Sequence, residues 1–74
     1  MSKEITIGQI ITPQEMKACV AIWKTDRSNS HRRIMTEIIT PNMARINKAL
    51  GQENDPGFLA YAVEYALMQS EKAR

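Results

Sequence analysis

A cluster of basic side chains occupies residues 24–33 of the sequence. Its members are Lys24, Arg27, Arg32 and Arg33. They surround a polar turn that leads into a predicted helix, and the free N–H groups and positive dipole end of a helix N-terminus attract anions. Arginines there gain nothing from the helix dipole, so an anionic surface on a partner would offset their cost. The cluster therefore predicts a partner- or anion-binding site. The alternative is a basic turn that is only solvated.

The residues that most often perform catalysis lack suitable neighbours in the sequence. Ser28 and Ser30 precede His31, but a catalytic triad is defined by geometry, and no acid is evidently placed to orient the imidazole. The eight Asp and Glu residues are scattered, and we expect none of them in an apolar setting suited to acid–base work. We therefore expect no enzymatic activity.

Signals for a bound metal or cofactor are also missing from the sequence. His31 has no second histidine or cysteine at the spacing of metal ligands, and no glycine-rich phosphate loop occurs. We expect no metal and no cofactor, and we expect His31 to be buried and hydrogen bonded to another group.

The longest element is predicted from hydrophobic periodicity over residues 29–50. Wound as a single α-helix, this stretch gathers its apolar side chains on one side, and the phase continues across Pro41. The apolar side consists of Ile34, Met35, Ile38, Ile39, Met43, Ile46, Ala49 and Leu50. Proline removes one backbone donor, so we predict a long central helix kinked at Pro41. A break, with Thr40 capping a new helix, is the alternative.

Local hydrogen-bonding signals mark the start of two more helices. The sequence TPQE at 12–15 is a capping box with proline at the first helical position, and it predicts a helix over residues 13–25 with Trp23 as a core anchor. The DP pair at 55–56 repeats this start and predicts a helix over residues 56–71.

The end of the central helix and the conformation of the N-terminal segment are predicted from a glycine and from the alternation of polar and apolar residues. Gly51 is expected to end the central helix in the left-handed conformation. Residues 3–7 alternate polar and apolar side chains, as a short strand does. We therefore expect residues 1–11 to form an extended arm. Together these elements predict a single all-α domain, residues 1–74, of three to four helices.

The helix over residues 56–71 has a wide apolar surface. Phe58, Leu59, Ala62, Val63, Ala66 and Leu67 cover more than half of its circumference, and Tyr61, Tyr65 and Met68 extend that surface. A surface this wide predicts contact with more than one neighbour.

The size of the chain favours self-association. A helix over residues 29–50 is about 33 Å long at its normal rise, whereas a compact chain of 74 residues has a radius of gyration of roughly 11 Å. One copy would cover only part of the apolar side of this helix. We predict a homodimer whose interface includes Ile39, Met43, Ile46 and Leu50.

Cysteine usage and hydropathy suggest a compartment. Cys19 is the only cysteine, so no internal disulfide is formed and a reducing compartment fits best. No apolar run reaches transmembrane length, and the sequence does not start with a secretory signal. We expect a cytoplasmic protein without a membrane partner.

These observations predict a small protein-interaction or regulatory module that presents the basic turn and exposed tyrosines to an anionic partner surface. In the alternative, residues 3–39 loosely resemble a ribbon-helix-helix repressor, with a short strand, a Pro-capped helix, a Ser-rich basic turn and a second helix. That resemblance implies a DNA-binding transcriptional regulator. Residues 8–12 separate strand from helix, where that family runs almost directly on, and the helix over residues 56–71 has no counterpart in it. A protein partner is therefore favoured over nucleic acid.

Overall fold

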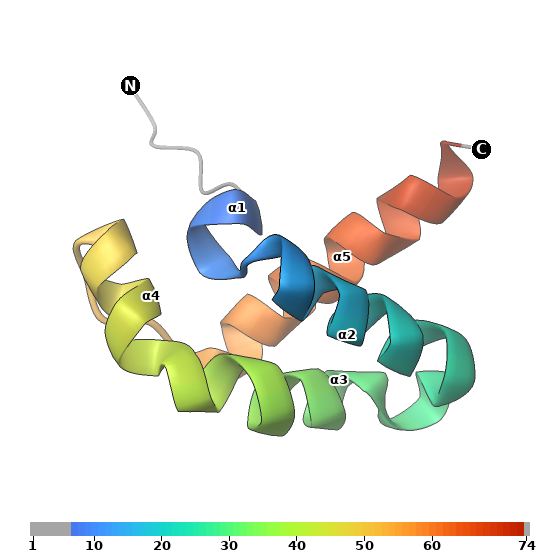
Figure 1. The fold of residues 1–74 in the computed structure, drawn as a ribbon, viewed down its shortest axis with the longest axis horizontal. Coiled ribbons are helices and arrows are strands. Elements are labelled where there is room, and N and C mark those ends of the chain that lie inside the picture. Colours follow the sequence, from blue (N-terminus) through green and yellow to red (C-terminus); the bar gives the residue numbers. More distant parts are fainter. Residues whose placement is uncertain (1–6, 74) are drawn as a thin grey trace.

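Residues 7–73, the part of the chain that the computed structural model describes, are helical over most of their length (Figure 1). The α-helices in this range are α1 (Ile7–Ile10), α2 (Pro13–Thr25), α3 (Ser30–Arg33), α4 (Met43–Leu50) and α5 (Pro56–Lys72). Two 3₁₀ turns, Arg27–Asn29 and Thr40–Asn42, and a π-helical segment, Ile34–Ile39, complete the path. No strand occurs between residues 7 and 73, so the predicted all-α class is confirmed.

The helix ends are set by the local hydrogen bonds that the sequence predicts. The Thr12 hydroxyl accepts from the Glu15 N–H at 3.2 Å, and the Glu15 carboxylate accepts from the Thr12 N–H at 2.8 Å, which completes the capping box of α2. The Asp55 carboxylate accepts from the Phe58 N–H at the start of α5. Gly51 ends α4 with φ +71°. Both predicted helix starts and the left-handed glycine are thus confirmed.

The predicted extended arm is wrong where the structure describes it. Residues 1–6, which include most of the strand predicted over residues 3–7, lie outside the described part, and Ile7–Ile10 form one helical turn instead of an extended segment. This turn buries Ile10 and Ile11 almost completely. The Arg45 guanidinium also donates to the Ile10 carbonyl at 3.0 Å. Tertiary burial of apolar side chains therefore favours a helical turn over the extended conformation expected for this part of the arm.

The central stretch stays helical through Pro41, but it is not a regular α-helix. The Thr40 N–H bonds to the Met35 carbonyl five residues earlier, as in a π-helix. Pro41 has no N–H to donate, and the Asn42 side-chain amide donates to the Ile38 carbonyl at 2.7 Å. Figure 1 shows α4 directed away from the line of α3. The change of direction falls on the irregular turns around Pro41, which are a known cause of kinks.

Helix α5 is the common neighbour of the other elements. It packs against α1, α2, α3 and the π-helical segment. The largest fully buried side chains come from α1, from the central stretch and from α5. They include Ile10, Ile34, Ile39, Ile46, Leu59 and Val63.

This packing buries two of the four residues predicted at a dimer interface within a single chain. Ile39 and Ile46 are completely buried within one chain, whereas Met43 and Leu50 are half-buried. The bend around Pro41 allows α1 to cover α4 and allows α5 to cover the π-helical segment. In this fold a second copy could reach only Met43 and Leu50 of the four.

Replacing Ile46 by aspartate should unfold the domain. A carboxylate without a partner in the core costs several kcal/mol, which approaches the whole stability of a small domain. The matched control is Ala44→Asp, an exposed position on the same helix, which should keep the melting temperature close to that of the wild type. Circular dichroism during thermal denaturation measures both variants, and equal melting would contradict the burial of Ile46.

Asn42→Ala should destabilise the fold modestly. The Ile38 carbonyl loses its donor, and such a loss costs about 1 kcal/mol, or about 4–8 °C in melting temperature for a domain of this size. Thr40→Ala, an exposed neighbour, is the control and should leave the melting temperature unchanged. If Asn42→Ala melts like the wild type, the side chain does not replace the missing backbone donor.

Candidate partner-binding surface

Arg27, the first arginine of the predicted basic cluster, is held by contacts within the chain. Its guanidinium carbon lies 3.7 Å from the centre of the Trp23 ring. Its Nε donates to the Trp23 carbonyl at 2.9 Å, and a terminal nitrogen pairs with the Glu71 carboxylate of α5 at 3.0 Å. The charge of Arg27 therefore joins α2 to the end of α5.

Arg33 is likewise engaged by acids of its own chain. It pairs with Glu37 one helical turn later at 2.8 Å and with Asp26 at 3.3 Å. The hydrogen bond with Glu37 raises the pKa of Arg33, and the hydrogen bond from Arg33 lowers the pKa of Glu37. Both groups are therefore charged at neutral pH and largely offset each other.

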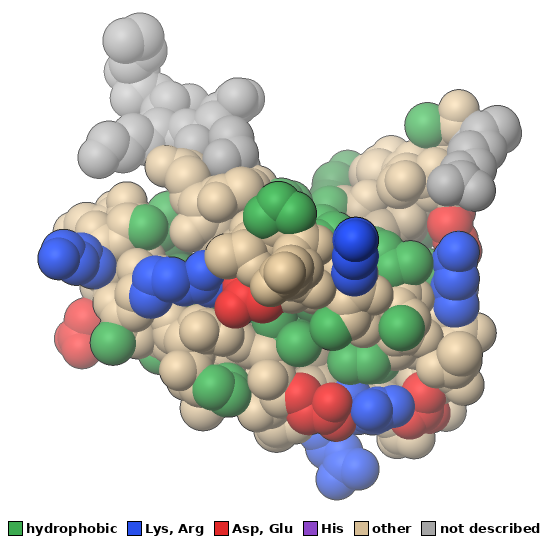
Figure 2. Space-filling view, viewed as in Figure 1, with side chains coloured by type: hydrophobic (Ala, Val, Ile, Leu, Met, Phe, Trp, Pro, Cys, Tyr) green, Lys and Arg blue, Asp and Glu red, His purple; other side chains and the backbone are tan. Residues whose placement is uncertain are grey.

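Lys24 and Arg32 carry the free positive charge of the cluster. Both side chains are exposed, and neither side chain makes a hydrogen bond or an ion pair with another residue between 7 and 73. Figure 2 shows Lys and Arg side chains interleaved with Asp and Glu side chains on the face it presents, without a continuous positive area. The four basic residues thus do not act together as one free cationic group.

The structure brings together three polar residues that the sequence does not connect. The Ser30 hydroxyl donates to one oxygen of Glu64 at 2.5 Å, and His31 Nδ1 lies 3.0 Å from the other oxygen. The ring of Tyr61 stacks on His31 at a centroid distance of 4.1 Å. The expectation that no acid accompanies His31 is therefore wrong, because α5 supplies Glu64. Its carboxylate is only 15% exposed.

This arrangement fixes two helices and differs from a catalytic triad. In a triad the imidazole lies between the hydroxyl and the acid. Here Glu64 lies between Ser30 and His31, so the hydroxyl proton of Ser30 is bound to a carboxylate. Ser30 is also buried. One sequence signal could have identified the cluster, because Glu64 interrupts the apolar surface of α5 between Val63 and Tyr65.

Cys19 is a free, buried cysteine. Burial raises the pKa of the Cys19 thiol to about 11, and the nearby Glu15 charge adds to the effect, so the thiol is protonated at neutral pH and a poor nucleophile. No group of three or more His, Cys, Asp or Glu between residues 7 and 73 is placed to hold a metal ion. Over the same range, every helix is too short or too polar to cross a membrane.

Large apolar side chains remain uncovered along one side of α5. They are Phe58, Tyr61, Tyr65 and Met68, with exposed fractions of 60%, 64%, 63% and 41%. Their spacing of three, four and three residues places them in one row on the helix. We call this row the α5 stripe. The wide apolar surface predicted for this helix is present, but the neighbours of α5 within one chain leave the stripe open.

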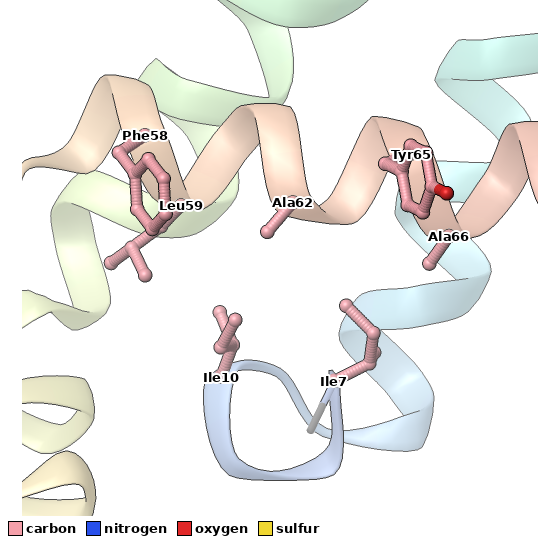
Figure 3. A pocket seen from close by; sticks show the side chains of 7 residues that line it. All are labelled: Ile7, Ile10, Phe58, Leu59, Ala62, Tyr65 and Ala66. Atoms are coloured by element: carbon pink, nitrogen blue, oxygen red, sulfur yellow. The ribbon is translucent and has the colours of Figure 1, made fainter. Parts of the chain in front are cut away.

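An apolar groove lies beside the stripe, where α1 faces α5. Its volume is about 290 Å³, and it is lined by Ile7, Ile10, Phe58, Leu59, Ala62, Tyr65 and Ala66. Figure 3 shows Phe58 and Tyr65 at its two ends, with Ala62 between them. The same view shows Ile7 and Ile10 on α1 at the opposite side. Small alanines between larger side chains leave room for an apolar group of a partner.

A second hollow lies on the other flank of Tyr65. We call it the Trp23 hollow; its volume is about 340 Å³, and it is lined by Trp23, Tyr61, Glu64, Tyr65 and Met68. Tyr65 lines both the groove and the Trp23 hollow. The two depressions and the α5 stripe therefore form one continuous surface.

Comparison with known proteins assigns no family, because no family model, no curated protein and no solved structure matches the chain. Function is therefore inferred from the geometry of the surface.

Arg33→Ala should raise the pKa of Glu37 toward its ordinary value of 4.5. Because Arg33 holds that pKa down, the pair stabilises the fold above the ordinary value, and this stabilisation is lost as the pH falls through the lowered pKa. Carboxyl ¹³C NMR titration of Glu37 measures the shift. Arg32→Ala is the matched control and should leave the titration unchanged. Identical titrations in the two variants would show that Arg33 does not hold Glu37.

Proposed function

We propose that this chain is a small non-enzymatic protein-interaction module whose contact surface is the α5 stripe with its two adjoining depressions. The observation that carries the proposal is the row of four exposed large side chains on one helix. Contiguous apolar surface of this kind marks interaction sites. Aromatic side chains also supply a large share of interface energy.

Rigid support beneath the stripe favours this role. Leu59, Val63 and Leu67 bury the opposite side of α5 in the core. Glu64 binds Ser30 and His31 and so ties α3 to α5, and Tyr61 stacks on His31. A surface held in place before binding loses less conformational entropy when a partner docks.

The free charges of the basic turn would then act at the edge of the contact. Lys24 borders a small depression together with Trp23, Leu67 and Glu71, next to the Trp23 hollow. Peripheral charges mainly influence the association rate and the choice of partner. An anionic patch on the partner opposite Lys24 and Arg32 remains part of this proposal.

A second copy of the chain is one candidate partner in this proposal. Burial of the α5 stripe against another α5 stripe would produce a homodimer without involving Ile39 or Ile46. The free, buried Cys19 is compatible with a reducing compartment, and we propose the cytoplasm. The DNA-binding alternative is not pursued, because Arg27 and Arg33 are paired with acids of their own chain and the two charge signs are mixed on the visible face (Figure 2).

Site-specific photo-crosslinking tests the contact surface. A benzophenone amino acid at position 65 should give a crosslinked product of defined mass in extract from the source cells. The same group at Ala44, an exposed position on α4, should not. Crosslinking from positions 24 and 32 but not from position 65 would mean that the partner contacts the basic turn and not the α5 stripe. A product of twice the subunit mass would identify a second copy as the partner, and sedimentation equilibrium at micromolar concentration would check that assignment.

A further inference from the structure

The Trp23 hollow differs chemically from the α1–α5 groove. The groove is lined by apolar and aromatic side chains alone, whereas the hollow is lined by three aromatic residues, Met68 and an acid, Glu64. Glu64 is the one charged residue among those that line the hollow. Aromatic rings carry negative electrostatic potential on their faces and attract cations. The hollow therefore has the electrostatic character of a cation site.

Glu64 also lacks a permanent positive partner. In the other ion pairs between residues 7 and 73, the acid faces an arginine, and each of those acids is more exposed than Glu64. Among the residues that the structure describes, the only basic partner of Glu64 is His31, which carries charge only when protonated. Each carboxylate oxygen has two lone pairs, so Glu64 still has capacity to accept after it binds Ser30 and His31. Glu64, the least exposed acid among these pairs, thus lines a hollow whose other lining residues carry no positive charge.

The same fold already shows how a guanidinium binds such a combination of groups. Arg27 lies over the Trp23 ring and pairs with a carboxylate of α5, Glu71. About two helical turns earlier on α5, Glu64 shares the Trp23 hollow with Tyr61 and Tyr65. Aromatic rings and an acidic residue, the kinds of group that hold Arg27, thus occur again in the hollow, and no arginine is among the residues that line it.

We propose that the Trp23 hollow receives a cationic side chain, arginine or lysine, of the protein that docks on the α5 stripe. This inference rests on the proposed interaction function and specifies the partner's chemistry. The cation lies beside the rings of Tyr61 and Tyr65, and its charge is balanced by Glu64. An uncharged side chain would leave that carboxylate without a counter-charge.

NMR titration with small probes tests the hollow independently of any natural partner. The probes are N-acetyl arginine methylamide, the corresponding lysine compound, and the norleucine compound as a neutral apolar match. The chain has one tryptophan and two tyrosines, so the indole and ring signals are readily assigned. At about pH 8, where histidine side chains are ordinarily neutral, the arginine or lysine probe should shift the Trp23 and Tyr65 signals saturably at millimolar concentration. The norleucine probe should bind at least about threefold more weakly, given the usual strength of a cation–π contact.

Two matched pairs of variants separate charge from simple apolar contact. Glu64→Gln keeps an acceptor for Ser30 and should weaken binding of the cationic probe roughly fivefold, the upper range for a partly exposed ion pair. Glu53→Gln makes the same charge change in the loop before α5 and should have no effect. Tyr65→Phe keeps an aromatic face and should bind like the wild type, whereas Tyr65→Leu should bind about two- to fivefold more weakly. Thermal melts verify that each variant is folded.

The outcomes discriminate the two proposals. Equal shifts with the norleucine and arginine probes, or equal binding by Tyr65→Phe and Tyr65→Leu, would overturn the cation site. If crosslinking from position 65 still captures a partner in that case, the interaction function stands and only the cationic chemistry is lost. If the Glu64→Gln variant does not fold, the Tyr65 pair still decides the question.

Discussion

Helix α5 is apolar around most of its circumference, and a chain of this size has too few other helices to cover it. Its neighbours α1, α2, α3 and the π-helical segment leave one side of it uncovered. The buried and exposed positions of α5 divide accordingly, with Leu59, Val63 and Leu67 inside and the α5 stripe outside. Small domains bury a smaller fraction of their surface than large ones. The exposed stripe is therefore a consequence of chain size combined with an apolar sequence.

Local interactions were the part of this fold that the sequence could predict. The Thr12 capping box, the Asp55 cap and the left-handed Gly51 each depend on residues within a few positions, and all three appear in the structure. The path through Pro41 was also recognisable, because the hydrophobic phase continues across it. The replacement of a backbone donor by the Asn42 side chain was not, since several irregular turns satisfy the same periodicity.

Features that depend on distant contacts could not be read from the sequence. Ile7–Ile10 forms a helical turn because α4 and α5 offer a surface to bury it, and no local signal indicates that surface. Glu64 meets Ser30 and His31 only after α3 and α5 pack together. The free charge of the basic turn could not be predicted either, because it depends on ion pairs formed in the fold. Counting arginines predicts a cationic site, but Arg27 and Arg33 are balanced by acids of their own chain.

Placement of charge relative to aromatic rings gives the surface its chemical character. Arg27 balances the charge of Glu71 beside Trp23. Glu64 lies among Trp23, Tyr61 and Tyr65 with only a histidine for a basic partner. The contacts with Ser30 and His31 hold the Glu64 carboxylate in place without a permanently charged partner. A carboxylate held in this way among aromatic side chains favours a cationic group on a docking partner.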